Sequence, residues 1–336
     1  MKSLLSLPRV PLVTGPTPLQ PAPRLSAALG TEVWLKRDDL TGLGLGGNKL
    51  RGLEYLLGEA IEQGCDCLVT GAGAQSNWAM LAALAARRSG LDPYLVFYGS
   101  PTQPVGNLLL DELIGADVRF TGELDRASVD FAMNKLGDDL TAAGRRPYVV
   151  PRGGATELGA AGYVRASLEL ADQLLATGLV PSQLWLATGS CGTQAGLVAG
   201  ARWLRSPYQV VGVTVSRPAA ECLDRVTSLA DGVAGLLGLP HADGFESEAV
   251  GEPAAVGGFT VLGGYLGPSY GQSSPEGQDA ARLVARTEGV FLDPVFGAKA
   301  MAALIDAARS GQVVGPVVFL VSGGAPMLFA GPKESV

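Results

Sequence analysis

The residue in this 336-residue sequence that best suits covalent chemistry is Lys49, one of six lysines. It follows Gly46-Gly47-Asn48 and begins a predicted helix over 49–63. A cation at a helix N-terminus opposes the helix dipole, so a lysine that only improves solubility gains nothing there. A lysine whose ammonium is destabilised has a lowered pKa and can act as a Schiff-base nucleophile, acid or base. Taken alone, Lys49 also fits an ordinary exposed lysine.

A glycine-rich turn is the second candidate. Residues Gly189, Ser190, Cys191, Gly192 and Thr193 follow a predicted strand and open a predicted helix. Their amides and the helix dipole would converge on an anion such as phosphate, although a plain strand-to-helix turn explains them equally well. The G-x-G-x-x-G fingerprint of dinucleotide sites is absent. A P-loop over 42–49 fails because Leu50 stands where a hydroxyl residue must bind magnesium.

The sequence contains one histidine, His241, in a predicted loop. A Ser-His-Asp triad, a Cys-His pair or a two-histidine zinc site would all have to be built around it. The sequence therefore predicts no metal site. If the protein is an enzyme, a group other than histidine must transfer its protons.

Charge and hydropathy exclude several partners. The net charge of −7 argues against nucleic acid and anionic membranes, which require a basic surface. The longest apolar stretch, 78–86, is far shorter than the ~20 residues that span a bilayer. The four cysteines are too few and too scattered for a disulfide framework, so we expect a reduced, cytoplasmic protein.

Short β-branched runs alternate with helical-period runs, which is typical of an α/β fold with parallel sheets. The predicted strands are 33–37, 67–70, 94–98, 118–121, 148–150, 184–187, 210–215, 290–292 and 317–321. The predicted helices are 49–63, 76–88, 125–143, 158–177, 193–204, 275–287 and 299–310. Residues 244–264 are predicted to be an irregular connection. Glycines cluster where strands end, and ligands bind at that edge of a parallel sheet.

Six motifs in this order resemble one known family. They are Lys36-Arg37-Asp38-Asp39-Leu40-Thr41, Gly46-Gly47-Asn48-Lys49-Leu50-Arg51, Gly73-Ala74-Gln75-Ser76-Asn77, Gly189–Gly196, Gly267-Pro268-Ser269-Tyr270-Gly271 and Asp293-Pro294-Val295-Phe296. From about residue 8 to 330 the chain resembles the 1-aminocyclopropane-1-carboxylate (ACC) deaminase and D-cysteine desulfhydrase family. That family has the tryptophan-synthase-β-like fold of pyridoxal-phosphate enzymes, an open twisted parallel-sheet fold of two domains.

The resemblance assigns roles to these residues. Lys49 would hold pyridoxal phosphate as a Schiff base and move a proton, and Asn77 would lie beside the cofactor's 3-hydroxyl. Ser76, with the amides of Asn77 and Trp78, would receive the carboxylate of a small amino-acid substrate. Tyr270 would assist the leaving group. The phosphate would lie in the backbone of Gly189, Ser190, Cys191, Gly192 and Thr193. Each residue alone has an ordinary explanation, but one ligand accounts for all of them.

The resemblance also implies an organisation. A smaller α/β domain, residues 52–160, would be inserted into a larger one formed by 1–51 and 161–336. The cofactor would bind between the two domains. A homodimer is expected from the resemblance only.

The sequence departs from the family at several positions. Phe296 and Gly297 replace the tyrosine and glutamate of ACC deaminases, which puts ordinary ACC deaminase activity in doubt. Val321 replaces a histidine, but Ser322 keeps the hydroxyl of D-cysteine desulfhydrases. Trp78 is bulkier than the residue common in relatives; it would reshape the substrate pocket or pack in the core.

A neutral Ser322 hydroxyl facing the pyridine nitrogen would leave that nitrogen largely unprotonated, which favours prompt loss of a β leaving group. We therefore expect a lyase that eliminates the β-substituent of a small amino acid, such as D-cysteine, giving pyruvate and ammonia. The alternatives are opening or forming the cyclopropane ring of ACC without the tyrosine, β-replacement, and a non-catalytic relative that only binds a ligand.

Overall fold

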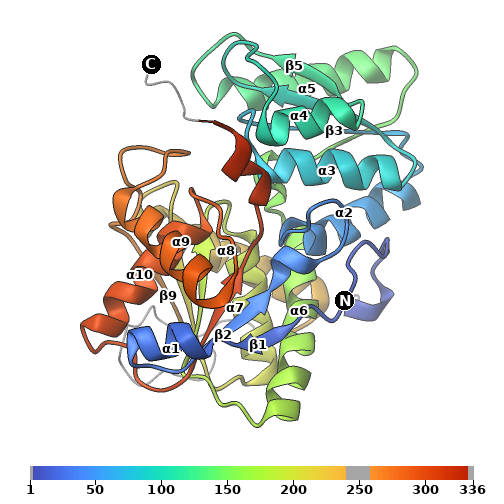
Figure 1. The fold of residues 1–336 in the computed structure, drawn as a ribbon. Helices are drawn as coiled ribbons and strands as arrows, with labels where there is room; N and C mark the ends of the chain where they lie inside the picture. The colour runs from blue at the N-terminus through green and yellow to red at the C-terminus, as the bar shows by residue number, and fades with distance from the viewer. Residues whose placement is uncertain (1–2, 240–257, 332–336) are drawn as a thin grey trace.

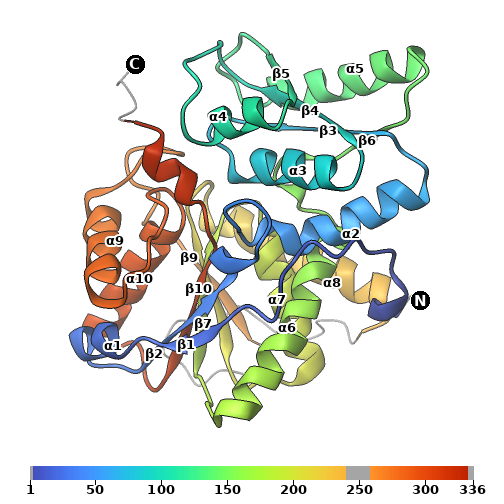
Figure 2. The ribbon, with the colours of Figure 1, turned by 45° about the vertical axis from the view of Figure 1, so that its right-hand side comes forward.

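The computed structural model describes residues 3–239 and 258–331. His241 and its predicted loop lie outside these residues. The described chain contains two sheets, each with helices on both faces (Figure 1, Figure 2). Apolar runs without alternation are typical of parallel sheets covered on both faces, and the fully buried strand Gln209–Thr214 shows that pattern.

The larger sheet has six strands in the order β1-β2-β10-β7-β8-β9. All neighbours are parallel except β1 and β2. The strands are β1 (Leu19–Pro21), β2 (Val33–Arg37), β7 (Gln183–Thr188), β8 (Gln209–Thr214), β9 (Phe259–Leu262) and β10 (Val317–Val321). One face carries α1 (Pro23–Leu29), α9 (Pro275–Glu288) and α10 (Gly297–Arg309). The other carries α6 (Glu157–Thr177), α7 (Gly192–Leu204) and α8 (Ala219–Leu237).

The smaller sheet has four parallel strands in the order β5-β4-β3-β6. They are β3 (Cys67–Ala72), β4 (Asp92–Phe97), β5 (Asp117–Phe120) and β6 (Pro147–Val149). Helices α3 (Asn77–Arg88) and α4 (Gly106–Leu113) cover one face, and α5 (Ser128–Ala142) covers the other. Helix α2 (Lys49–Glu62) packs against both α3 and α6, so it links the two sheets. Short 3-10 helices are η1 (Leu4–Ser6), η2 (Asp38–Leu40), η3 (Arg152–Gly154) and η4 (Ala325–Phe329).

The predicted α/β class is confirmed, and eight of the nine predicted strands form, with ends that shift by a few residues. The strand predicted at 290–292 is wrong. Val290 and Leu292 are buried while Phe291 is 66% exposed, so the segment alternates like a strand. It nevertheless pairs with no strand among the described residues and leads directly into the turn at Asp293. The sequence boundaries of the two domains stay a prediction.

The segment 244–264 was expected to be irregular throughout, and that expectation is wrong for its last part. Residues 259–262 form β9, which pairs with β8 at the edge of the larger sheet. Paired glycines on both sides of this four-residue strand hide its pattern. Residues 244–257 lie outside the described chain. Strand β1 and helices α1, α4 and α8 were not predicted.

An ion cluster fixes the beginning of α2. Arg51, two residues after Lys49, donates to both carboxylate oxygens of Asp38, at 2.7 and 2.8 Å, and to Glu169 at 2.9 Å. Lys36 of β2 also pairs with Glu169 of α6. Because buried charges are stable only when they are paired and hydrogen-bonded, this cluster holds α2, and therefore Lys49, against β2 and α6.

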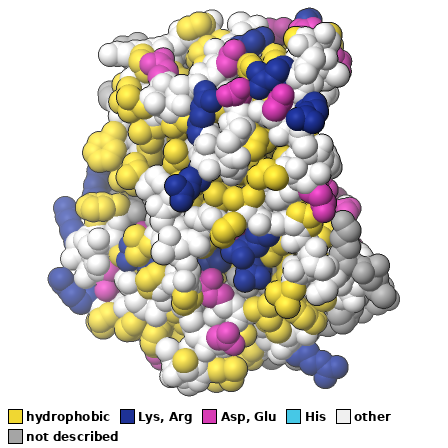
Figure 3. Space-filling view, turned by 90° about the vertical axis from the view of Figure 1, so that its right-hand side faces the viewer, with side chains coloured by type: hydrophobic (Ala, Val, Ile, Leu, Met, Phe, Trp, Pro, Cys, Tyr) yellow, Lys and Arg dark blue, Asp and Glu magenta, His cyan; other side chains and the backbone are white. Residues whose placement is uncertain are grey.

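On the face shown in Figure 3, basic side chains are interspersed with acidic and hydrophobic ones. Among the helices that the structure describes, none has the length and apolar character needed to cross a bilayer.

Candidate active site

A cavity of about 430 Å³ is lined by residues of both sheets. Residues that follow the carboxyl ends of β3, β6, β7, β8 and β10 form its walls, which is where ligands bind to parallel sheets. The predicted site residues that line it are Lys49, Ser76, Asn77, Trp78, Gly189, Ser190, Cys191, Thr193, Tyr270, Phe296 and Ser322. Gly192 lines a smaller cavity together with Lys49, Ser190 and Thr193. The structure therefore brings together residues that lie as far apart as 49 and 322.

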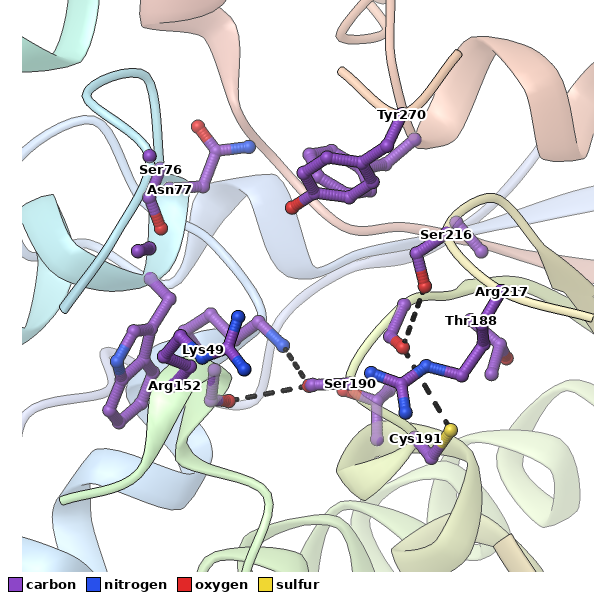
Figure 4. Close-up of a pocket in the computed structure, with 18 of the residues that line it drawn as sticks. Lys49, Ser76, Asn77, Arg152, Thr188, Ser190, Cys191, Ser216, Arg217 and Tyr270 are labelled. Carbon is purple, nitrogen blue, oxygen red and sulfur yellow. Dashed lines mark hydrogen bonds between the residues drawn. The ribbon is translucent and has the colours of Figure 1, made fainter. Parts of the chain in front are cut away.

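Lys49 is the first residue of α2, and its side chain points toward Ser190 across the cavity (Figure 4). Its Nζ donates to the Ser190 Oγ at 3.1 Å. Loss of water around the ammonium lowers the pKa of Lys49 to about 8. No carboxylate in the described chain forms an ion pair with Lys49 to oppose this shift. With this pKa, about a tenth of Lys49 is the neutral, nucleophilic amine at pH 7, far more than for an unperturbed lysine.

The turn before α7 leaves its first backbone amides available. Cys191, the N-cap of α7, has φ 76 and makes no side-chain cap. A non-glycine residue in this left-handed region costs roughly 1–3 kcal/mol, and such strain is typical of ligand-binding sites. Ser216 donates to the Gly189 carbonyl at 3.0 Å, and Arg225 donates to the Ser190 carbonyl at 3.3 Å. The carbonyls are thus held by side chains while the amides at the helix end can face an anion.

The turn before α3 forms the opposite wall (Figure 4). Ser76 is the N-cap of α3, and its Oγ accepts from the amide of Ala79 at 3.2 Å. An N-cap is an ordinary structural role for a serine, yet Ser76 also lines the cavity. The Asn77 Oδ1 accepts from the Nδ2 of Asn107 at 2.7 Å. The N-terminus of α3 therefore presents amides and one oriented side-chain amide to the cavity.

Trp78 lies at the edge of the cavity but mainly in the protein core. Its side chain is 4% exposed, and its Nε1 donates to the Thr70 Oγ1 at 2.9 Å. A Cβ added at Gly154 would lie 2.2 Å from the indole ring, so Gly154 provides the space that the ring occupies. The packing explanation thus accounts for most of this side chain, and contact with substrate stays a prediction.

Tyr270 lies between Arg126 and Phe296. The Arg126 guanidinium carbon is 3.9 Å from the centre of the Tyr270 ring, and the rings of Tyr270 and Phe296 meet edge to face at 6.3 Å. Burial raises the pKa of Tyr270, and Arg126 opposes that increase. The phenol is therefore a neutral donor at physiological pH, and Figure 4 shows its hydroxyl directed toward the cavity.

The departures from the family lie close together. Asp293 accepts from the amides of Val295, Phe296 and Gly297 at 3.0, 2.7 and 2.8 Å, which caps α10 and fixes the Phe296 backbone. Phe296 and Ser322 line the cavity. An aromatic ring without a phenol, Phe296, and the hydroxyl of Ser322 therefore face the same cavity.

Several cavity residues were not predicted. They are Tyr98, Arg126, Asp130, Arg152, Ser216, Arg217 and Arg225. Tyr98 directly follows β4, and Ser216 follows β8 after one residue. The rule that placed Gly189 at a strand end would have found these two. Arg126 and Arg225 lie near or within helices, where no strand-end signal exists.

Comparisons with known proteins agree with this geometry. A family model described as pyridoxal-phosphate dependent enzyme matches residues 10–323. The chain belongs to this family. The enzyme is 39% identical to the D-cysteine desulfhydrase of Salmonella choleraesuis (strain SC-B67), over 97% of both chains. It is also 39% identical to the D-cysteine desulfhydrase of Klebsiella pneumoniae (strain 342), over 98% of both chains.

Solved structures support the same fold for this pyridoxal-phosphate enzyme. An ACC deaminase homologue superimposes with a TM-score of 0.86 at 36% identity, covering 97% of this chain and 94% of the other. Threonine deaminase isoform 2 from Solanum lycopersicum gives a TM-score of 0.64 at 19% identity, covering 93% and 80%, which shows the fold alone. The predicted fold class, family and cofactor are confirmed.

The cavity of this pyridoxal-phosphate enzyme fits its cofactor. An amine of lowered pKa, Lys49, is available to an aldehyde. The uncapped amides at the start of α7 suit a phosphate, and the Asn48 Nδ2 holds the Thr193 hydroxyl in that turn at 3.0 Å. Both features lie on the same cavity, so one molecule with an aldehyde and a phosphate can engage both.

Proposed function

We propose that this enzyme is a lyase that eliminates the β-substituent of a small amino acid, with D-cysteine as its substrate. The observation that carries the proposal is the 39% identity to D-cysteine desulfhydrases over 97% of both chains. The cavity supports it, because Ser322 offers a hydroxyl while Phe296 offers no phenol for opening a cyclopropane ring.

Lys49 would bind the aldehyde of the cofactor and, once the substrate amine has replaced it, act as the base. Its Nζ would remove the α-proton, and the hydrogen bond to Ser190 would orient the amine. Bound pyridoxal phosphate supplies the electron sink for the electrons of the broken C–H bond. Ser322 would face the pyridine nitrogen with a neutral hydroxyl.

The N-terminus of α3 would hold the substrate carboxylate. Ser76 and the first amides of the helix provide donors beside the positive end of the helix dipole. Tyr270, a neutral donor on the opposite wall, would donate a hydrogen bond to the sulfur as the C–S bond breaks. The released enamine tautomerises to an imine and reacts with one water, so D-cysteine and water give pyruvate, ammonia and hydrogen sulfide.

We further propose that the enzyme is a cytoplasmic homodimer with the two domains predicted from the sequence. The four free cysteines suit a reducing compartment.

The test is incubation of the purified enzyme with D-cysteine, L-cysteine and ACC, followed by assays of keto acid and sulfide. We expect equal amounts of pyruvate and sulfide from D-cysteine. Formation of 2-oxobutyrate from ACC, with no sulfide from either cysteine, would overturn the proposal. A protein that gains no visible absorption band with added pyridoxal phosphate would instead be a non-catalytic relative.

Ring chemistry on ACC is the second candidate, favoured by the 36% identity to the ACC deaminase homologue. It would need a donor other than the missing phenol at Phe296, and Tyr270 is the tyrosine that lines the cavity beside it. Tyr270→Phe would then abolish 2-oxobutyrate formation from ACC.

A further inference from the structure

Asn107 is a buried side chain outside the lining of the active-site cavity. It is 0% exposed and lies in the first turn of α4. Its Nδ2 donates to the Gln75 carbonyl at 3.0 Å and to the Asn77 Oδ1 at 2.7 Å. Its backbone amide donates to the Gln75 Oε1 at 3.0 Å. Three hydrogen bonds therefore connect this one residue to the turn that carries Ser76 and Asn77.

These bonds fix which end of each side-chain amide is nitrogen. A backbone carbonyl can only accept, so the Asn107 atom facing the Gln75 carbonyl must be the nitrogen. The same nitrogen also faces Asn77, so Asn77 must present its oxygen there. The Asn77 nitrogen is consequently the end that remains for other partners, one of which is the Met327 sulfur at 3.4 Å.

Both side-chain hydrogen bonds of Asn107 within the described chain go to the turn at the start of α3. Its own Oδ1 is buried without a hydrogen-bond partner in the described chain, so the side chain acts only as a donor. An unsatisfied buried acceptor destabilises the folded state, and an apolar residue would avoid that cost. Gly106 allows the approach of Gln75, since a Cβ there would lie 2.5 Å from the Gln75 Oε1.

We infer that Asn107 is a positioning residue that makes Asn77 a hydrogen-bond donor toward the cofactor. The inference rests on the proposed site, in which Asn77 lies beside the 3-oxygen of pyridoxal phosphate. A donor there stabilises that oxygen as an anion, whereas a flipped Asn77 would set oxygen against oxygen. Asn107 controls this choice from outside the cavity.

Asn107→Asp tests the inference with nearly unchanged shape. A carboxylate cannot donate, so it would attract the Asn77 nitrogen and turn the Asn77 oxygen toward the cofactor. Asn107→Ala removes the hydrogen bond that orients Asn77 without favouring the opposite orientation. It is the variant to measure if the buried carboxylate of Asn107→Asp prevents folding. Asn134→Asp, an exposed change on α5, controls for the added charge. Each variant is also made in an Asn77→Ala background.

The readouts are the dissociation constant of pyridoxal phosphate and the pH midpoint of the bound cofactor's visible absorption band. We expect Asn107→Asp to weaken cofactor binding about tenfold and to raise the midpoint by about one pH unit, with Asn107→Ala between it and the wild type. Asn134→Asp should change neither. In the Asn77→Ala background, the effects of both Asn107 substitutions on the midpoint should vanish.

Two results would overturn the inference. One is a folded Asn107→Asp and Asn107→Ala pair with the wild-type midpoint and affinity. The other is a shift of the same size with and without Asn77, which would show that Asn107 acts only on stability. Failure of the proposed cofactor site looks different, because the wild-type protein itself would then form no visible band.

Discussion

Two lysines 13 positions apart in the sequence show how burial creates either a structural or a reactive group. The Lys36 side chain is 3% exposed in the ion cluster, and Lys49 lines the cavity. Loss of water lowers the pKa of both. Asp38 and Glu169 oppose the shift at Lys36, whereas the hydroxyl of Ser190 is the acceptor at Lys49.

The difference lies in the partners rather than in the lysine. Lys36 pairs with Glu169 and donates to the Thr17 carbonyl at 2.7 Å, so its ammonium is hydrogen-bonded and inert. Lys49 lacks a carboxylate partner in the described chain, so no ion pair offsets the free-energy cost of removing water from its ammonium. The ion cluster stabilises the fold, and the cavity keeps an amine that costs stability.

Removal of Lys49 should have the largest effect. Lys49→Ala should lower turnover of D-cysteine by at least about 10³-fold and abolish the borohydride-sensitive visible band, because no other lysine of the described chain lines the cavity. Lys135→Ala, at an exposed ion pair on α5, is the matched control and should behave like the wild type. Turnover that survives in Lys49→Ala would disprove the role of this residue.

The two lysines should affect stability in opposite directions. Lys36→Met leaves Glu169 short of one partner and should lower the free energy of unfolding by about 3 kcal/mol. Lys49→Met removes an unpaired ammonium and should raise it by about 1–3 kcal/mol in the cofactor-free protein. Denaturant unfolding of the cofactor-free protein at pH 7 measures both. Changes of the same sign would contradict the comparison.

The reactivity of Lys49 should depend on pH with a midpoint near 8. Its pKa in the folded protein is lowered to about 8, so below that pH the reactive neutral amine falls about tenfold per unit. The rate at which cofactor-free protein takes up pyridoxal phosphate should therefore rise with pH and level off above 8. Stopped-flow absorbance measures the rate. A rise that continues to pH 10 would show an unperturbed lysine.

The same pKa fixes a pH dependence of stability. The unfolded chain holds the Lys49 proton more tightly than the folded one, so between about pH 8 and 10.5 the unfolded state binds more protons. The Lys49 contribution to stability therefore improves as pH rises through this window.

Asp38 and Glu169 have lowered pKa values, because their basic partners outweigh the cost of burial. Their contribution is present above pH 5 and is lost as the pH falls through those values.

The sequence located the candidate site residues better than the residues that support them. Lys49, Ser76 and the turn at Gly189 lie at the ends of helices and strands, where glycine spacing and helix periodicity can be read from the sequence alone. Asn107 could not be found this way, because its role depends on α4 packing beside the Gln75 turn. The strand prediction at 290–292 failed for the same reason. Alternation along the sequence indicates which side chains are buried, but a strand also needs a neighbouring strand with which to pair.

The smallest effect should come from the hydroxyl beside Lys49. The Ser190 Oγ accepts from the Nζ at 3.1 Å and donates to the Gly153 carbonyl at 3.3 Å, so it is held in place as an acceptor. An acceptor stabilises the charged amine, and Ser190→Ala should lower the uptake midpoint by less than about one pH unit. Ser182→Ala, which removes a hydroxyl distant from the cavity, controls for the loss of a serine. An upward shift of the midpoint would contradict this assignment. It would mean that the Ser190 hydroxyl donates its hydrogen bond to a neutral Lys49, so Ser190 would be the donor of the pair and Lys49 the acceptor.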